Sequence, residues 1–365
     1  MKKIITVESV TKGHPDKVCD QIADSILDAY LKQDAQARVA CEVCINKNLV
    51  LVMGEITSIA LVDIESIVRK TIVDIGYDRD SLGFNGHNVP IQIMIHEQSK
   101  DIALGVDKNG AGDQGIMYGY ATDETDNYMP LACNLANCLA SRLDFVRENN
   151  IVRGLRPDGK SQITLEYDDG VRVKAIVISV SHEENKDLSL LQEEIKREVI
   201  RKIVPLELID DETQILINPT GNFVICGPCG DTGVTGRKIM VDTYGGLARH
   251  GGGAFSGKDY TKVDRSAAYY ARYVAKNIVY QKMAKEVLIG VSYAIGIDMP
   301  LQLDIETFET NLVDMEIIYK YVNENFNFRV SNIIQELDLK HVDYITTTMY
   351  SHFGKENLPW EKLKN

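Results

Sequence analysis

Apolar residues recur along this chain with two different periods, one typical of helices and one typical of strands. Within 16–31 they follow one another at four-residue intervals, which predicts a helix. Apolar and polar residues then alternate over 38–56, with a polar interruption at 46–48, and this predicts a hairpin. A second helical pattern at 62–77 and an apolar run at 89–96 complete the first unit. Its expected order is helix, hairpin, helix, strand.

The same order of patterns occurs twice more, so the chain contains an internal repeat. The second copy has two helices, a hairpin that turns at 168–170 and a strand, at 129–146, 188–204, 161–180 and 213–218. The third copy has two helices and a hairpin, at 263–283, 315–326 and 287–305, and we expect it to follow the same four-element order. Such a repeat predicts three α+β units, each burying one apolar face of a sheet.

Composition narrows the class of protein. At 365 residues, two or three domains are expected, and 44% apolar with 25% charged residues is ordinary for a globular enzyme. The net charge of −13 argues against binding to nucleic acid or to anionic membranes. Apolar runs are shorter than a membrane span, and the first nine residues turn polar before a signal-peptide core could form. We therefore expect a cytoplasmic protein.

The seven cysteines include two pairs with the C-x-x-C spacing, Cys41 with Cys44 and Cys226 with Cys229. The first pair falls in a strand pattern, where residues three apart point to opposite faces. The second pair is followed by glycines instead of the helix that a thioredoxin-like site requires. We interpret all four as core or loop cysteines, with redox or zinc chemistry as the less favoured alternative.

Three consecutive glycines, 251–253, precede a run of charged residues. Glycines let backbone N–H groups approach an anion, and a helix follows, so the segment favours phosphate binding. The spacing from Gly252 to Lys258 also fits a P-loop. However, Asp259 stands where the Mg²⁺-binding hydroxyl would be, which argues against a Walker site. A local concentration of cations in an acidic protein suits a small polyanion with metal ions: Arg237, Lys238, Lys258, Lys262 and Arg265.

Two helix starts carry an aspartate at the same place. Pro15 fits the first position of the helix at 16–31, and Asp16 falls in its first turn, as Asp264 does in the third copy. Simple capping explains both aspartates, and shared Mg²⁺ ions explain them equally well. His14 is either a local hydrogen-bonding residue or an acid/base group.

Four further positions stay open on spacing alone. Glu55 keeps the phase of apolar neighbours in its strand, where it is either a functional carboxylate or an exposed strand end. Glu42 alternates with apolar residues and could face water. The glycine-dense segments 110–115 and 218–238 are either tight turns or parts of one ligand site, and their interleaved charges favour the ligand site.

Five motifs together resemble the S-adenosylmethionine synthetase (methionine adenosyltransferase) family. They are GAGDQGIMYGY at 110–120, GGGAFSGKD at 251–259, HPDK at 14–17, RPDGKSQ at 156–162 and DTGVTGRK at 231–238. The resemblance covers nearly the whole chain. It implies an α+β fold of three similar units with pseudo-threefold symmetry, each a mixed or antiparallel sheet packed by helices. We place these units at 1–100, 110–226 and 227–365.

The resemblance also implies an activity. ATP, L-methionine and water would give S-adenosylmethionine, pyrophosphate and phosphate, with two Mg²⁺ per site and one K⁺ per subunit. The enzyme would be a homodimer or a dimer of dimers, with active sites between subunits. The segment 98–109 would be a mobile gate over the site.

Residue roles follow from the same resemblance. Catalytic residues around the triphosphate would be His14, Lys160, Arg237, Lys238 and Lys258. Further ATP contacts would come from Asp113, Asp158, Phe223, Asp231 and Ala254. Methionine would be bound by Glu55, Gln98, Asp231 and Lys262. The metal ligands would be Asp16 and Asp264 for Mg²⁺ and Glu42 for K⁺.

The segment 105–110 is shorter than in many members of the family, which bears on closure of the gate. One further position departs from the family pattern, and two other functions remain to be weighed. Asn222 stands where the family commonly has Arg, which predicts weaker ATP binding. If the chain were a regulatory subunit without catalytic activity, at least one motif residue would be expected to be missing. All of the motif residues are present. A kinase or ligase would rely on the P-loop-like spacing that Asp259 undercuts.

Overall fold

The computed structural model describes residues 3–97 and 110–364. Its longer helices are α1 (Pro15–Gln33), α2 (Ile64–Ile75), α4 (Leu131–Glu148), α5 (Leu188–Ile195), α8 (Val263–Tyr280), α9 (Met315–Asn325) and α10 (Val330–Glu336). A π-helical turn (Lys196–Ile200) and the short α6 (Arg201–Ile203) extend α5, and α7 (Ile239–Asp242) is a single turn. These residues and the strands below match the predicted α+β class.

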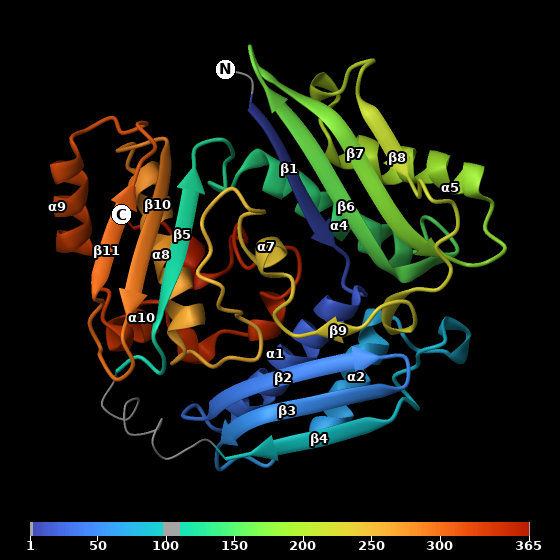
Figure 1. The fold of residues 1–365 in the computed structure, drawn as a ribbon, viewed down its shortest axis with the longest axis horizontal. Coiled ribbons are helices and arrows are strands. Elements are labelled where there is room, and N and C mark those ends of the chain that lie inside the picture. Colours follow the sequence, from blue (N-terminus) through green and yellow to red (C-terminus); the bar gives the residue numbers. More distant parts are fainter. Residues whose placement is uncertain (1–2, 98–109, 365) are drawn as a thin grey trace.

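Three sheets surround the centre of the molecule (Figure 1). The first, in the order β4-β3-β2-β9, contains Ile91–His96, Leu49–Thr57, Arg38–Asn46 and Gly233–Val234. The second, β1-β6-β7-β8, contains Lys3–Val10, Leu155–Tyr167, Val171–His182 and Gln214–Ile217. The third, β11-β10-β5, contains Gln302–Glu306, Glu286–Tyr293 and Gly115–Thr122. Each is built on an antiparallel hairpin, and β4 and β8 add parallel strands.

Each hairpin pairs with a strand from another of the three predicted units. β9 pairs with β2, β1 with β6, and β5 with β10, always antiparallel. The first unit thus lends a strand to the second, the second to the third, and the third to the first. This cyclic exchange accounts for a pseudo-threefold arrangement in which the sheets meet at the centre.

One long helix covers one face of each sheet. α1 packs on β2, α4 on β1 and β6, and α8 on β5 and β10. The four-residue apolar row of α1 is buried as the sequence pattern predicted, at Val18, Ile22, Ile26 and Tyr30. The chain's last segment returns to α8, where the Trp360 ring stacks on Tyr269 at 3.7 Å and Glu361 pairs with Arg272 at 3.0 Å.

The helices and hairpins expected from the pattern are all present, within a few residues of their predicted bounds. The four-element order is wrong for the third copy, because among the described residues α9 is followed by α10 and short turns, with no closing strand. The residues after α9 pack against α8 instead, as Trp360 and Glu361 do. Within the described parts of the chain, no helix has both the length and the apolarity required to span a membrane.

Candidate active site

The start of α1 carries the first cluster of predicted site residues. His14 is the N-cap, Pro15 occupies the first turn, and His14 Nδ1 accepts a hydrogen bond from the Asp16 backbone N–H at 3.2 Å. Asp16 in turn accepts from Lys238 Nζ at 2.8 Å and from the Val234 backbone N–H at 3.0 Å. His14 therefore makes the local hydrogen bond that was one of its two interpretations, while Asp16 joins the helix start to the segment that carries β9.

Electrostatics in this cluster keep Asp16 charged and His14 neutral. Burial, together with the nearby charges of Lys238 and Lys160, lowers the pKa of His14 to about 3. Burial alone would raise the pKa of Asp16, but its hydrogen bonds from Lys238 and Val234 bring it below its usual value. Since Nδ1 of His14 is occupied as an acceptor, Nε2 carries the proton and can donate it in a hydrogen bond. Arg237 Nε lies 3.7 Å from Asp16 Oδ1.

Asp158 lies at the side of the first cluster, on β6. Its Oδ2 accepts the Gly227 backbone N–H at 2.8 Å, whereas its Oδ1 is buried without a hydrogen-bond partner among the described residues. Burial raises the pKa of Asp158 to about 6. A buried oxygen that lacks a donor is costly, so Asp158 is suited to accept a hydrogen bond from a ligand.

Three other predicted residues border the same cluster. Lys160 is exposed on β6, and its positive charge helps to lower the pKa of His14. Asp231 is also exposed, and its negative charge helps to raise the pKa of Asp158. Two hydrogen bonds join Phe223 to His182. The Phe223 backbone N–H donates to His182 Nε2 at 3.1 Å, and the His182 backbone N–H donates to the Phe223 carbonyl oxygen at 3.0 Å.

The start of α8 carries the second cluster. Lys258 Nζ donates to Asp264 Oδ2 at 2.6 Å, which repeats the Lys238–Asp16 pairing at the start of α1. The glycines before Lys258 permit close contacts with this helix. A Cβ on Gly253 would lie 2.3 Å from the Asp264 carboxylate, and one on Gly251 would lie 1.6 Å from the Ile116 carbonyl oxygen of β5. The glycine loop thus fits directly against the carboxylate.

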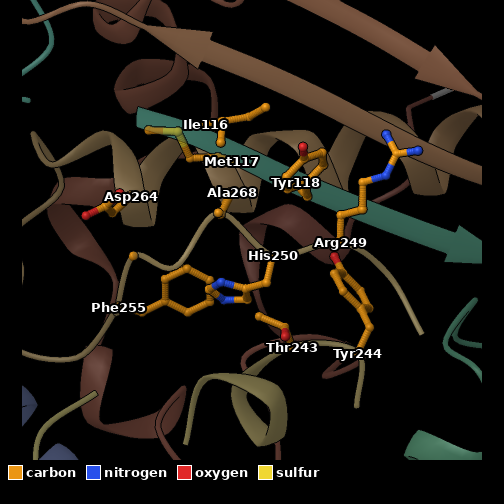
Figure 2. A pocket seen from close by; sticks show the side chains of 12 residues that line it. Ile116, Met117, Tyr118, Thr243, Tyr244, Arg249, His250, Phe255, Asp264 and Ala268 are labelled. Atoms are coloured by element: carbon orange, nitrogen blue, oxygen red, sulfur yellow. The ribbon is translucent and has the colours of Figure 1, made fainter. Parts of the chain in front are cut away.

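A pocket opens beside the second cluster (Figure 2). Ile116 and Tyr118 of β5 line one side, and His250 and Phe255 line the other. Asp264 lies at one end. Asp264, a predicted metal ligand, thus lines the pocket, whereas Ile116, Tyr118, His250 and Phe255 were not among the predicted site residues.

Lys262 lies near the edge of β2, to which it is joined through Asp259. Lys262 Nζ donates to Asp259 Oδ2 at 2.6 Å, and the buried Asp259 also accepts the Val39 backbone N–H of β2 at 2.7 Å. Asp259 is therefore a structural carboxylate that fixes the loop, which explains its presence in a segment with P-loop-like spacing. Lys258 itself forms an isolated bridge with Ala40 of the same strand.

Glu42 and Glu55 lie on the face of the first sheet opposite α1. Their strand neighbours Met53 and Met94 are 36% and 56% exposed, so this apolar face is open in the single chain. Burial raises the pKa of the half-buried Glu42. Glu55 Oε1 lies 3.2 Å from His96 Nε2.

The remaining predicted residues have simple positions. Ala254 packs against Gly236, where an added Cβ would approach the Ala254 Cβ to 2.5 Å, so the two glycine-rich segments touch. Asp113 is exposed just before β5, and its Oδ1 accepts the Gln114 backbone N–H at 2.7 Å. Gln98 and the predicted gate at 98–109 lie outside the described residues.

The predicted residues thus form two clusters in one chain. Around Asp16 lie His14, Asp158, Lys160, Phe223, Asp231, Arg237 and Lys238, and around Asp264 lie Glu42, Glu55, Asp113, Lys258 and Lys262. Within the described residues no hydrogen bond or ion pair links a member of one cluster to a member of the other. Both clusters meet the same edge of β2, where Val234 pairs with Cys44 and Lys258 pairs with Ala40.

Sequence reasoning missed the acidic row of α1. Asp20 and Asp24 are fully buried and accept the backbone N–H groups of Gly236 and Gly257, next to the predicted cations. The signal was present, because aspartates recur at every fourth residue from Asp16 to Asp28. That spacing places all four on one face of a helix.

The cysteine interpretation agrees with the structure. Cys41 is buried and Cys44 is half-buried on the opposite face of β2. Burial raises the pKa of Cys226 to about 11 and also raises the pKa of Cys229, which lies in a short 3₁₀ turn, Gly227–Cys229. Reactive thiols have lowered pKa values, so these are not of that kind.

Three α+β units with glycine-rich loops beside carboxylate–cation clusters suit an enzyme that binds a phosphorylated ligand. Comparison with known proteins identifies which one. Residues 2–100, 108–223 and 225–362 match the N-terminal, central and C-terminal domains of S-adenosylmethionine synthetase. The chain is 52% identical to the S-adenosylmethionine synthase of Finegoldia magna, over 99% of this chain and 97% of the relative. It is 51% identical to that of Clostridium botulinum, over 100% and 97%.

The chain therefore belongs to the S-adenosylmethionine synthetase family, and it is a methionine adenosyltransferase by class. The resemblance seen in its motifs is confirmed.

Proposed function

We propose that this protein makes S-adenosylmethionine by a two-step reaction. The methionine sulfur attacks the 5′ carbon of ATP, the S–C bond forms as the C–O bond breaks, and the triphosphate leaves with the bonding electrons. Water then cleaves the triphosphate to pyrophosphate and phosphate. The observation that carries this proposal is the repeated pairing of an aspartate at a helix start with a lysine from a glycine-rich loop, Asp16 with Lys238 and Asp264 with Lys258.

The first step needs positioning and charge stabilisation more than proton transfer. Attack at a saturated carbon requires no general base, so in-line placement and cations near the leaving oxygens dominate. Arg237, Lys238 and Lys258 supply these cations. The low pKa of His14 supports a role as a neutral hydrogen-bond donor to the leaving side through Nε2. Water cleavage of the bound triphosphate uses the same cations.

The two aspartates suit Mg²⁺. This ion binds through one or two carboxylates together with phosphate oxygens and waters, and each cluster offers one such carboxylate beside a lysine. Asp16 and Asp264 would hold the two ions, and Glu42 would hold K⁺. Bound Mg²⁺ would neutralise charge on the triphosphate oxygens. The lysines now paired with the carboxylates would then turn to phosphate.

The remaining assignments follow the two clusters. Asp158, Phe223 and Asp231 would contact the nucleotide beside the first cluster, with Ala254 and Asp113 nearby. Glu55, Lys262 and Gln98 would bind methionine, together with Asp231. The segment 98–109 would act as the gate, and the units would be 1–100, 110–226 and 227–365.

We further propose that a complete site forms between two copies of the chain. The apolar face around Met53 and Met94 is open in the single chain, carries Glu42 and Glu55, and is suited to bury against a second copy. A twofold interface would bring Glu42 and Glu55 of one copy toward the first cluster of the other. A dimer of dimers and a cytoplasmic location remain predictions of the same kind.

The test follows both products. Purified protein is incubated with ATP, methionine, Mg²⁺ and K⁺, and the sulfonium product is followed by mass spectrometry alongside phosphate and pyrophosphate. Sulfonium with equal amounts of phosphate and pyrophosphate is expected. Nucleotide binding without sulfonium would support a regulatory subunit, and a phosphorylated acceptor would support a kinase or ligase.

A further inference from the structure

Helix α1 carries a buried row of four aspartates at four-residue spacing. Asp16, Asp20, Asp24 and Asp28 are 2%, 0%, 0% and 4% exposed. Carboxylates are almost never fully buried unless they are paired, so each of these must have defined partners. The proposed function assigns a role to Asp16 alone.

Asp20 and Asp24 accept hydrogen bonds from two glycines that directly precede predicted triphosphate cations. The Gly236 N–H donates to Asp20 Oδ1 at 2.8 Å, and the next residue is Arg237. The Gly257 N–H donates to Asp24 Oδ1 at 2.8 Å, and the next residue is Lys258. Both glycines have positive φ, 77° and 81°, so the backbone at these points adopts a conformation that other residues disfavour.

Ion pairs hold both carboxylates in place. Lys17 Nζ lies 3.0 Å from Asp20 Oδ2, and Lys17 also pairs with the buried Asp242. Arg265 reaches Asp24 with two nitrogens, each at 2.8 Å. Because these carboxylates are sealed from solvent and already paired, they act on a ligand only through the loops that they hold.

We propose that Asp20 and Asp24 are positioning residues for the triphosphate-binding cations, an inference that rests on the proposed function. Residues four apart on a helix lie about 5–6 Å from each other at Cβ. One rigid helix therefore fixes the backbone before Arg237 and Lys238 of the first cluster and before Lys258 of the second. Deleting either acceptor would release the backbone beside a cation without removing any group that touches ATP.

Asp28 provides a matched control on the same helix face. It accepts the backbone N–H groups of Tyr344 and Ile345 at 2.8 and 2.9 Å, so it makes the same kind of contact. Neither partner has a predicted role at the site. Loss of Asp28 should therefore lower stability without changing how the protein handles ATP.

The experiment compares Asp20→Ala, Asp20→Asn and Asp28→Ala with the wild-type protein. Each is tested for the KM of ATP, the KM of methionine, urea unfolding and calorimetric binding of inorganic tripolyphosphate. Asparagine keeps an oxygen that accepts the Gly236 N–H, while alanine does not. Because misplacement by about 1 Å can cost up to about 100-fold in rate, we expect Asp20→Ala to raise the ATP KM and the tripolyphosphate Kd about tenfold. Its methionine KM should stay within about twofold, and Asp20→Asn should stay within about twofold in all constants.

Each outcome distinguishes a positioning role of Asp20 from a general effect on the stability of the protein. Equal changes in ATP KM for Asp20→Ala and Asp28→Ala would overturn the inference, as would an Asp20→Asn variant with the alanine phenotype. If Asp20→Ala does not fold, Asp20→Asn decides alone, because a rise of about tenfold in its ATP KM would assign the effect to charge and not to the backbone contact. A wild-type protein that binds tripolyphosphate but makes no sulfonium would refute the proposed function and leave the tripolyphosphate comparison as the test of positioning.

Discussion

Lys258 donates a hydrogen bond to Asp264 across 2.6 Å at the start of α8, as Lys238 does to Asp16 at the start of α1. In the proposed site, Mg²⁺ would compete with the ammonium group for the same carboxylate. Bound triphosphate would relieve this competition, because its oxygens attract both the lysine and the metal ion. Metal and triphosphate should therefore bind cooperatively.

This cooperation predicts how loss of one carboxylate affects Mg²⁺. Asp264→Asn should raise the Mg²⁺ concentration needed for half-maximal activity about tenfold, since Mg²⁺ prefers a charged oxygen ligand. Asp314→Asn is the control, because Asp314 is an exposed residue at the start of α9 and makes no capping hydrogen bond. Titration of activity with Mg²⁺ checks the prediction, and equal Mg²⁺ requirements in the two variants would contradict it.

The proposed site between two copies of the chain predicts complementation between inactive subunits. Lys238→Ala and Lys258→Ala should each be inactive, because each removes one cation from every site. In a mixed dimer both changes fall in one site and the other site is intact, so random mixing should restore about a quarter of wild-type activity. Co-expression with two affinity tags measures this directly. Activity no higher than that of the single variants would show that each subunit builds its own complete site.

Asp158 predicts a pH-dependent contribution to stability. Burial raises its pKa from 3.8 to about 6, so the native state favours the protonated form. Ionisation of Asp158 therefore lowers the free energy of unfolding by its full amount above pH 6. This loss becomes smaller as the pH falls from 6 toward 4. Asp158→Asn is neutral throughout and should exceed the wild-type free energy of unfolding by about 3 kcal/mol near pH 8, with the difference vanishing near pH 4.

Urea unfolding across this range measures the Asp158 effect. Because all other titrating groups are shared by the two proteins, their difference isolates this residue. A difference that stays constant with pH would mean that Asp158 titrates normally in the folded chain.

Asn222 predicts a weaker hold on ATP than in relatives that carry arginine there. Asn222 is exposed, and the next residue, Phe223, is fixed by His182, so a longer cationic side chain at 222 could extend without disturbing the backbone. Asn222→Arg should lower the ATP KM about threefold to tenfold, as one charge-assisted contact to phosphate would. Steady-state kinetics check it, with Asn222→Gln as the uncharged control. An unchanged ATP KM in the arginine variant would count against the prediction.

Local patterns predicted most of the fold because helices and hairpins are specified by nearby residues. The strands β1 and β5 were not predicted, and for β5 the reason is physical. β5 contains Gly115 and Gly119, which make it look like a loop, yet a Cβ on Gly119 would lie 2.0 Å from the Ala271 carbonyl carbon of α8. The glycine is there because the helix backbone approaches the strand, and that contact spans 152 residues of sequence.

The candidate site, like the fold, was predicted only in part. Motifs predicted which residues to examine, but spacing could not show that Asp16 and Glu42 lie on opposite sides of a sheet. Nor could it show that Asp20 and Asp24 hold loops more than 200 residues away, because their partners are backbone groups that carry no sequence signal. The contacts of Asp20 and Asp24 join residues of different units, as the strand exchange does.

That exchange has a consequence for how the protein is made on the ribosome. Domains generally fold as units from the N-terminus during synthesis, but here β2 acquires its partner β9 only at Gly233–Val234. The aspartates of α1 gain their backbone hydrogen-bond partners still later, when Gly236, Gly257 and finally Tyr344 have been synthesised. The earliest-synthesised sheet is thus among the last to be completed. During most of translation, the nascent chain carries an unpaired strand edge and a helix whose four aspartates lack their backbone partners from later parts of the chain.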